Sequence, residues 1–416
     1  MYIMLESKDA YTYKGATVLE PKKGIYHNLI VVDVISLYPS MAILYNISFD
    51  TVNCECCKDD QDARIPCEIG NMFNSDSDSD RRESKNYWIC KRIEGIFPKK
   101  LSLFKDERIR QKQSGNTVKQ LALKILINGG YGVFGNRFFK YYDPRVAELI
   151  TAYGRYTLTK MQEIAKEMGL DVVYGDTDSL FIDICINNYG ECNTENTGSG
   201  TITQVKNNIT TKQVSKFKEE CNRRLEIEVE HSKTYKTAII SGRKKHYIGW
   251  TGISGSAPDI VGMEGDKNDR PKWINNVFRQ VVEGILGVNE NNADPISVLE
   301  KSISDLELGK VDHELLTRSV KLSKNPDEYH NTNDRKRRLG IAIGARKGDV
   351  IEYYESDNSK TGYSLNYQDI SIGKYKLMLW KTVKEILEIA RFDVSSIEHH
   401  LGFGSRSKNV DGRSAN

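Results

Sequence analysis

Positions 172–181 read VVYGDTDSLF and place Asp176 and Asp178 between two apolar, strand-forming segments. Valine, tyrosine, leucine and phenylalanine favour strands, and Gly175 permits a tight turn, so this stretch predicts a β-hairpin. We expect both carboxylates at its tip and on one face, because alternate residues of a strand share a face. Two such charges repel each other unless a cation lies between them, and Mg²⁺ prefers carboxylate oxygens. A solvated hairpin turn is the alternative, since glycine and aspartate are common in turns.

Another carboxylate lies inside an apolar run. Positions 29–35 read LIVVDVI, the pattern of a strand buried on both faces, and this run contains Asp33. A buried aspartate costs free energy unless it is paired or binds a metal. Pro39 disfavours a helical conformation at Tyr38, so we expect the strand to end there. Together with the two hairpin carboxylates, Asp33 predicts a site for two metal ions of the kind that promotes phosphoryl transfer.

Three motifs, in this order along the chain, resemble those of the family B DNA polymerases. Positions 33–40 (DVISLYPS) resemble the family's motif A, 124–132 (KILINGGYG) its motif B and 174–179 (YGDTDS) its motif C. The later segments 244–247 (KKHY) and 262–264 (GME) are similar to the family's basic K-K-x-Y motif and to the G-x-E near the start of its thumb. The resemblance spans nearly the whole chain and is greatest for the archaeal and eukaryotic replicative type.

This resemblance implies a template-directed DNA polymerase that adds deoxynucleotides to a primer 3′-hydroxyl by a two-metal mechanism, in DNA replication or repair. It implies the α+β class, with an antiparallel-sheet palm, helical-hairpin fingers and a mainly helical thumb. The implied domains are a first part of the palm at 1–97, fingers at 98–140, a second part of the palm at 141–255 and a thumb at 256–416. A palm-type enzyme that makes RNA or copies RNA is a rival, against which the forms YGDTDS and SLYPS argue.

The resemblance also assigns roles to single residues. The catalytic carboxylates would be Asp33, Asp176 and Asp178, and two Mg²⁺ ions would be held by these three side chains and the backbone carbonyl of Val34. The residues expected to bind the nucleotide are Ser36, Leu37, Tyr38, Arg108, Lys112, Lys124, Asn128 and Tyr131. The residues expected to contact primer–template DNA are Thr177, Lys244, Lys245 and Tyr247.

The cationic residues among these have a second argument from helical spacing. Positions 101–112 and 117–128 each carry apolar residues at helical intervals, which predicts two antiparallel helices joined by a short turn. Arg108 and Lys112 lie one helical turn apart, and Lys124 lies on the facing helix. The three would form one cationic face on which a triphosphate can lie. An ordinary solvated face is the alternative.

The same patterns predict the remaining elements. Helices are expected at 147–167, 214–225, 273–286, 294–308 and 375–389, and strands at 225–230, 235–240 and 246–250. The polar segments 75–80 (SDSDSD) and 187–208 have little apolar surface to bury, and they predict loops.

Cysteines cluster early in the chain. Of 8 in all, Cys54, Cys56 and Cys57 form a C-x-C-C group, followed by Cys67 and Cys90. The group is compatible with part of a zinc site, but it lacks the paired C-x-x-C ligands that structural zinc prefers. Free thiols in a variable loop and a single disulfide are the alternatives.

The composition sets wider limits on location and partners. The chain has 416 residues, enough for two or three domains, and a net charge of +3, so a DNA-binding surface requires local clustering of charge. No stretch has the length and apolarity of a membrane span, and positions 1–10 lack the pattern of a secretory signal. We therefore expect an intracellular protein without membrane contact, located in the cytoplasm with the nucleoid or in the nucleus.

The family places an N-terminal domain and an exonuclease domain before motif A, and the sequence has no room for them there. We expect either the polymerase half of a split enzyme or a fragment, which extends a primer without degrading it. Candidate partners are primer–template DNA, deoxynucleoside triphosphates, a separate exonuclease-bearing polypeptide and a sliding clamp. The alternative function is a DNA-binding subunit that is inactive without that separate polypeptide.

Overall fold

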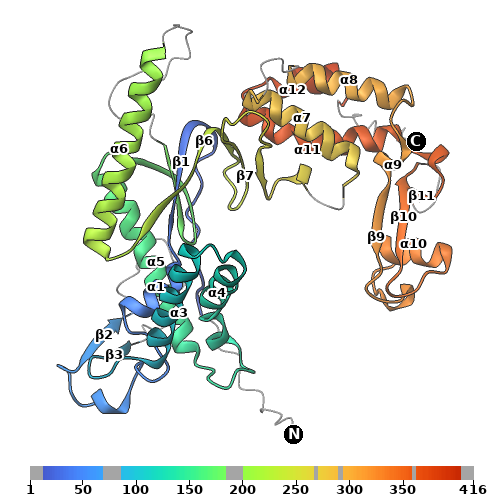
Figure 1. Ribbon diagram of the computed structural model, residues 1–416. Coiled ribbons are helices and arrows are strands. Elements are labelled where there is room, and N and C mark those ends of the chain that lie inside the picture. Colours follow the sequence, from blue (N-terminus) through green and yellow to red (C-terminus); the bar gives the residue numbers. More distant parts are fainter. Residues whose placement is uncertain are drawn as a thin grey trace, which may run out of the picture. The chain divides into compact units, whose positions relative to one another are not determined.

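The computed structural model describes residues 13–68, 86–183, 200–266, 270–288, 294–357 and 362–403, with side chains in the third range from residue 212 onward. The chain divides into two compact units, Met1–Pro21 with Asn28–Thr234 and Lys22–His27 with Tyr235–Asn416. Two long strands, β1 (Gly24–Val34) and β6 (Val229–Ile240), contribute residues to both units (Figure 1).

The first unit is built on an antiparallel sheet in which β5 lies between β4 and β1. Strands β4 (Asp171–Asp176) and β5 (Ser179–Asp183) form the predicted hairpin. β5 pairs with β1 from Leu29 opposite Asp183 to Asp33 opposite Ser179, and β6 is the next strand after β1. The four apolar residues of β1 directly ahead of Asp33, from Leu29 to Val32, are at most 4% exposed, as the uninterrupted apolar run predicts. Helices together with antiparallel strands confirm the α+β class.

Gly175 has a different role from the one expected. It lies within β4, opposite Leu180, and the turn residue with a left-handed backbone is Thr177, at a φ of 60°. A Cβ atom on Gly175 would lie 2.8 Å from Cδ1 of Leu19 and 2.9 Å from Cδ2 of Leu180, closer than side chains approach each other. Glycine is therefore required here by close packing, and the prediction that it permits the turn was wrong.

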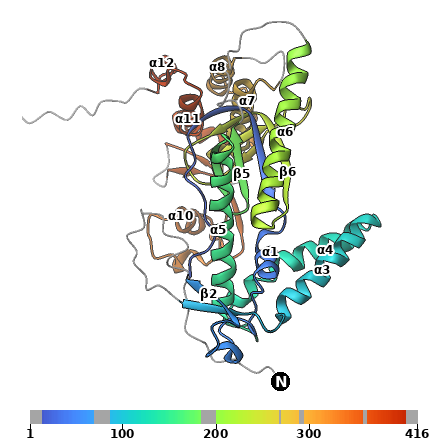
Figure 2. The same cartoon turned by 90° about the vertical axis from the view of Figure 1, so that its left-hand side faces the viewer.

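The helices of the first unit surround this sheet. Helix α5 (Pro144–Glu167) packs against β4, β5 and α6 (Gly200–Leu225), and its apolar side chains enter the same core as β1. Helices α3 (Ile96–Gln113) and α4 (Thr117–Gly129) form the predicted antiparallel pair, which extends away from α5 (Figure 2). The side chain of Asn116 caps α4 by accepting a hydrogen bond from the backbone N–H of Lys119.

Several predicted boundaries in this unit were wrong. Tyr38 and Pro39 lie in the first turn of α1 (Leu37–Leu44), and not at the end of a strand. Proline is tolerated in a first helical turn because its missing N–H would have no partner there. Helix α6 begins at Gly200, within the segment predicted as a loop, and β6 begins at Val229 rather than at 225. The predicted loop at 75–80 lies outside the described residues.

The second unit has a helical core and two sets of strands. The predicted helices α7 (Lys272–Leu286), α8 (Pro295–Glu307) and α11 (Ile372–Ile389) are present, and they pack together. The described part of this unit also contains the α-helices α9 (His313–Leu316), α10 (Arg335–Ile343) and α12 (Val394–His400). Strands β7 (Tyr247–Trp250) and β8 (Asp259–Val261) continue antiparallel from the end of β6.

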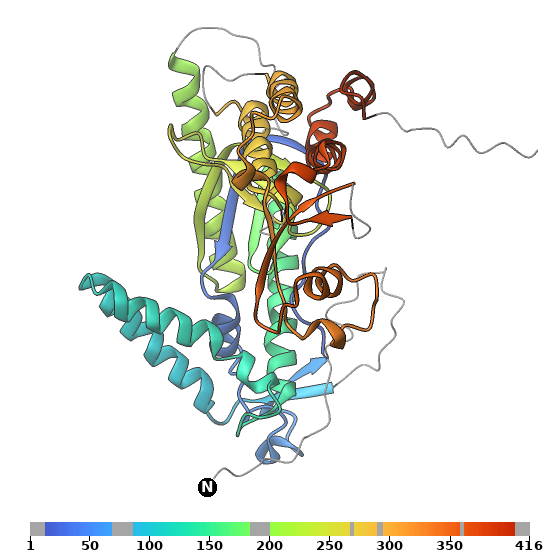
Figure 3. The same cartoon turned by 90° about the vertical axis from the view of Figure 1, so that its right-hand side faces the viewer.

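A second sheet in this unit was not predicted. It has the order β11 (Tyr363–Ser364), β10 (Val350–Glu355) and β9 (Arg318–Lys321), and is drawn in orange and red in Figure 3. Its short strands give too few alternating residues to stand out in the sequence. Among the described residues, no helix combines the length and apolar character needed to cross a membrane.

We expect Gly175→Ala to destabilise the first unit by about 1–3 kcal/mol, because the added methyl group overpacks the contact with Leu19 and Leu180. The midpoint of urea-induced unfolding measures this loss. Gly129→Ala is the matched control, since a Cβ there meets nothing within 4 Å and lies at a helix end. Equal midpoints for the two variants would contradict the packing role of Gly175.

Candidate active site

The backbone brings Asp33 and Asp178 together. Asp33 is the second-last residue of β1 and pairs with Ser179, the first residue of β5. One residue further on, the backbone N–H of Val34 donates a 2.8 Å hydrogen bond to the carbonyl oxygen of Asp178. The end of β1 is therefore fastened to the hairpin turn, and both carboxylates belong to the same edge of the sheet.

The two hairpin carboxylates have different surroundings. Asp176 is the last residue of β4, whereas Asp178 lies in the turn. The two residues are therefore not alternate residues of one strand, and the argument that placed them on one face was wrong. One carboxylate oxygen of Asp176 accepts a 3.1 Å hydrogen bond from the Thr177 hydroxyl, and its backbone carbonyl accepts one from the Ser179 hydroxyl at 3.0 Å. These bonds hold the turn in the left-handed conformation at Thr177, which a β-branched residue rarely adopts.

A cavity of about 400 Å³ opens at Asp33 and Asp178. Its walls come from β1, α1, α3, α4, the hairpin turn and the start of β6, all within the first unit. The lining residues are Asp33, Val34, Ile35, Ser36, Leu37, Tyr38, Pro39, Arg108, Lys124, Asn128, Tyr131, Asp178 and Glu230. Most of the residues predicted to bind metal or nucleotide thus surround one space, although Asp176 and Lys112 are not among its walls. Thr177, predicted to contact DNA, is not among them either.

Cationic side chains face this cavity from the helical pair. Arg108 comes from α3 and Lys124 from α4, whereas Lys112, one turn beyond Arg108, is exposed. The Nε atom of Arg108 is buried and makes no hydrogen bond within the described part of the chain. A buried donor without a partner costs free energy, and an anion in the cavity would supply the missing acceptor.

Two other cations of the pair, Lys119 and Arg110, have a carboxylate partner in Glu107. Glu107 receives a hydrogen bond from Lys119 and lies 2.9 Å from a guanidinium nitrogen of Arg110. The hydrogen bond from Lys119, and then that from Gln111, lowers the pKa of the Glu107 carboxyl. This arrangement joins α3 to α4 while the cations at the cavity remain available for a ligand.

Tyr38 forms part of the cavity floor. Its ring centroid lies 4.4 Å from that of Tyr131, and a Cβ atom on Gly154 would come within 2.9 Å of its Cε1 atom. Burial raises the pKa of the Tyr38 hydroxyl, and Tyr131 and Asp178 raise it further, so the phenol is neutral at physiological pH. The ring is thus fixed between α5 and Tyr131 beside the carboxylates.

Asp33 is partly buried and lies near charged residues. Burial raises the pKa of its carboxyl, a hydrogen bond with Ser232 opposes the rise, Glu230 adds to it and Lys233 opposes it. Glu230 was missed by sequence reasoning. The alternation at 225–230 indicated a polar face, but only the placement of β6 beside β1 shows that Glu230 lies at this cavity.

Comparison with known proteins agrees with this arrangement. A sequence profile described as DNA polymerase family B matches residues 1–356. The chain belongs to DNA polymerase family B. This family B chain is 30% identical over 407 residues to DNA polymerase 1 of Saccharolobus solfataricus, an alignment that covers 90% of the chain and 41% of the relative. It is 30% identical over 354 residues to a DNA polymerase of Archaeoglobus fulgidus, covering 85% of the chain and 40% of the relative.

A solved structure shares the fold. The family B DNA polymerase from the hyperthermophilic archaeon Pyrobaculum calidifontis matches with a TM-score of 0.60 at 23% identity, over 92% of this chain and 48% of that one. The family B chain described here therefore spans less than half the length of these relatives.

The basic motif of this family B chain lies in its second unit. Lys244 and Lys245 occupy the turn between β6 and β7, where Lys245 has a left-handed backbone with a φ of 59°. Tyr247 begins β7 and pairs with Val261 of β8. A Cβ atom on Gly262 would lie 2.0 Å from the carbonyl oxygen of Lys245, so only glycine allows this turn to pack against the end of β8.

We expect Asp33→Asn to stabilise this family B chain at neutral pH without divalent cations. The folded-state pKa of Asp33 is raised, so the wild type loses stability as pH rises from the unfolded pKa through the folded one. Asparagine does not ionise and avoids this loss. In the presence of a chelator, the urea midpoint of the variant should therefore exceed that of the wild type by more and more as the pH rises above about 4, the ordinary pKa of an aspartate.

Asp171→Asn, at the other end of β4 from Asp176, is the control for this experiment because it changes charge by the same amount. A difference between wild type and Asp33→Asn that stays constant across the pH range would contradict the raised pKa.

Proposed function

We propose that this chain is the polymerase part of a template-directed DNA polymerase, which extends a primer 3′-hydroxyl with deoxynucleoside triphosphates. The observation that carries the proposal is the single cavity that joins the carboxylates of Asp33 and Asp178 to the cations Arg108 and Lys124. Carboxylates suit divalent metal ions, and cations suit the phosphates that such ions accompany. Family membership supports the same chemistry.

The proposal assigns the structural parts of a polymerase to the elements of the fold. The sheet with α5 would be the palm, within 1–97 and 141–255, and α3 with α4 would be the fingers, within 98–140. The helical part of the second unit, within 256–416, would be the thumb. A sheet that carries acids, beside a helical pair that carries cations, supports this division.

The residues at the cavity fit the metal ions that the proposal requires. The carboxylates of Asp33 and Asp178 and the carbonyl of Val34 are hard oxygen donors, which Mg²⁺ prefers, and Asp176 lies in the same hairpin. Burial, and then the charge of Glu230, raise the pKa of Asp33, and a cation bound beside the carboxylate would favour its ionised form. Two such ions, when bound, favour loss of the primer hydroxyl proton and neutralise charge on the phosphates.

Side chains that line the cavity would orient the nucleotide. Arg108 and Lys124 would bind phosphate oxygens, with Lys112 further along the same helix, while Asn128 and Tyr131 would lie behind the base and sugar. The backbone at Ser36 and Leu37 would border the triphosphate. The primer 3′-oxygen would form a bond to the α-phosphorus as the bond to the pyrophosphate oxygen breaks.

The remaining residues of the proposal would contact DNA. Thr177 in the hairpin turn, and Lys244, Lys245 and Tyr247 in the second unit, would contact the primer–template. Lysine contacts to phosphates supply affinity that does not depend on sequence. Copying of cellular DNA, in replication or repair, would place the protein with the nucleoid or in the nucleus.

A DNA-binding subunit that acts only with a separate exonuclease-bearing polypeptide is the second candidate. The separate polypeptide would then be one partner of the chain, and a sliding clamp would be a further partner. Extension of a primer by the purified chain alone would exclude this candidate. A requirement for a second polypeptide would favour it.

We expect Asp178→Asn to lower the rate of nucleotide addition by at least about 10³-fold, because a neutral amide binds divalent ions poorly. Affinity for primer–template should change little, since cations supply it. Single-turnover primer extension and fluorescence anisotropy with labelled DNA measure the two quantities. Asp171→Asn should extend at the wild-type rate, and an Asp178→Asn protein that did the same would refute the role of Asp178.

Tyr38 provides a test of sugar selection. A ring fixed against Gly154 and Tyr131 would exclude a ribose 2′-hydroxyl by bulk, so Tyr38→Ala should incorporate ribonucleotides about 10²-fold or more readily relative to deoxyribonucleotides. Tyr38→Phe keeps the ring and should keep the wild-type ratio. Ratios of kcat/KM for matched ribo- and deoxyribonucleotides measure this, and an unchanged ratio in Tyr38→Ala would remove Tyr38 from the sugar site.

A further inference from the structure

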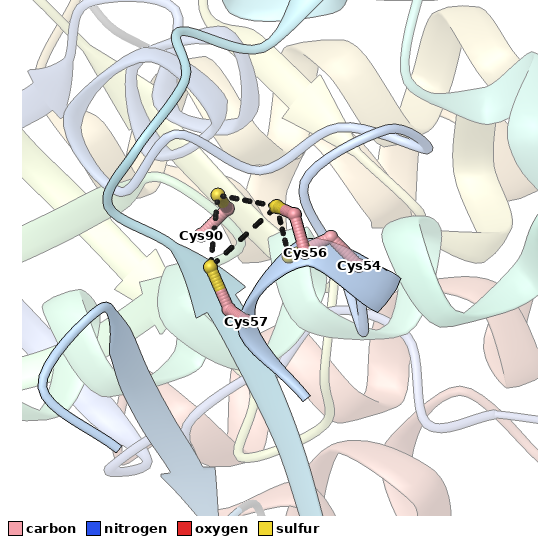
Figure 4. Close-up of side chains that lie close together, drawn as sticks. All are labelled: Cys54, Cys56, Cys57 and Cys90. Atoms are coloured by element: carbon pink, nitrogen blue, oxygen red, sulfur yellow. Dashed lines mark hydrogen bonds between the residues drawn. The ribbon is translucent and has the colours of Figure 1, made fainter. Parts of the chain in front are cut away.

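Four cysteine side chains meet at a place that the polymerase site does not use. Cys54, Cys56 and Cys57 lie in and just before a short 3₁₀ helix, η1 (Glu55–Cys57), and Cys90 ends β3 (Asn86–Cys90). Figure 4 shows their sulfur atoms converging, and every pair lies within 4.8 Å. The Sγ atoms of Cys56 lie 3.4, 3.6 and 3.6 Å from those of Cys54, Cys57 and Cys90, and Cys57 lies 3.3 Å from Cys90.

These separations match a single tetrahedral ion better than the alternatives. A Zn–S bond of about 2.3 Å places the sulfurs of a regular tetrahedron about 3.8 Å apart. An iron–sulfur cluster distributes its four cysteines over two or four iron atoms, so some or all of the thiolates lie further apart than around one shared ion. A disulfide would join two sulfurs at about 2.05 Å and leave two cysteines unused.

Hydrogen-bond donors and a cation lie beside the four sulfurs. The backbone N–H groups of Arg92 and Ile93 donate hydrogen bonds to the Cys90 sulfur. The Arg92 guanidinium donates to the carbonyl oxygen of Cys56 and pairs with Asp60, so positive charge lies beside the cluster. Backbone donors and a nearby cation stabilise the negative charge that four thiolates leave on a bound zinc ion.

We propose that Cys54, Cys56, Cys57 and Cys90 bind one structural Zn²⁺ ion. The sequence did not predict this set, because Cys90 is 33 residues from Cys57 and the spacing lacks paired C-x-x-C ligands. Cys67 is not a ligand, since its thiol lies 3.2 Å from the hydroxyl of Tyr153 within the apolar core. Three of the sulfurs come from one short loop, so Cys90 is the ligand that ties this loop to a distant strand.

The ion would fix the base of the helical pair. Cys90 precedes α3 by a short segment that is also held by Asn46, whose amide donates to the carbonyls of Cys90 and Ile93 at 3.0 and 2.9 Å. The backbone N–H of Gly95 in turn donates to the Asn46 side chain at 2.7 Å. Zinc at Cys90 and hydrogen bonds at Asn46 thus hold both ends of the segment from which α3, with Arg108, extends.

Metal content tests the proposal directly. The full chain is expressed with both zinc and iron supplied, purified under reducing conditions without chelator, and measured by plasma mass spectrometry. We expect about one zinc ion per chain in the wild type and in Cys67→Ser, and a fall to background in Cys57→Ser and Cys90→Ser. Cys67→Ser is the matched control because Cys67 is as buried as Cys90, at 1% exposure each.

Two further measurements test the proposal even if Cys57→Ser or Cys90→Ser fails to fold. Cys54→Ser changes a partly exposed thiol outside the core and should also lose the zinc. In the wild type, Co²⁺ exchanged for zinc should give the absorption bands of tetrahedral thiolate coordination. Zinc at the wild-type level in Cys54→Ser and Cys90→Ser would overturn the proposal. So would iron with acid-labile sulfide, or a metal-free wild type with a Cys57–Cys90 disulfide under non-reducing conditions.

Discussion

The candidate active site depends on the antiparallel pairing of β1 with β5, which continues into the hydrogen bond from Val34 to Asp178. This pairing brings Asp33 to the hairpin turn, although Asp33 and Asp178 are 145 positions apart in the sequence. The free energy that holds the carboxylates together comes from the buried strand behind them, where residues such as Leu29 and Val32 are fully covered. The sheet thus maintains a charge arrangement that is unfavourable by itself, and a bound cation relieves it.

Local patterns in the sequence were enough to predict many of the strands and helices that support the site. The apolar run around Asp33 and the two valines before Tyr174 have the composition of buried strands, and both form strands. The helical pair, and α5, α7, α8 and α11, carry apolar residues at intervals that only a helix brings to one face. These features depend on residues near in sequence, so one sequence suffices to predict them.

What the sequence could not show depends on contacts between distant segments. Gly175 is small because Leu19 packs on it, and Glu230 lies at the cavity because β6 is placed beside β1. Tyr38 is a local exception: it enters a helix despite the following proline, because a proline is tolerated in the first helical turn. The approach of Cys90 to the C-x-C-C group likewise results from the bridge between Val52 and Ile89.

The most direct test is a crystal structure of the chain with a dideoxy-terminated primer–template, the matching deoxynucleoside triphosphate and Mg²⁺. The account predicts metal density at the carboxylates of Asp33 and Asp178, the triphosphate within hydrogen-bonding distance of Arg108 and Lys124, and the sugar against the ring of Tyr38. A triphosphate bound outside this cavity, or metal ions without contact to Asp33 and Asp178, would contradict it.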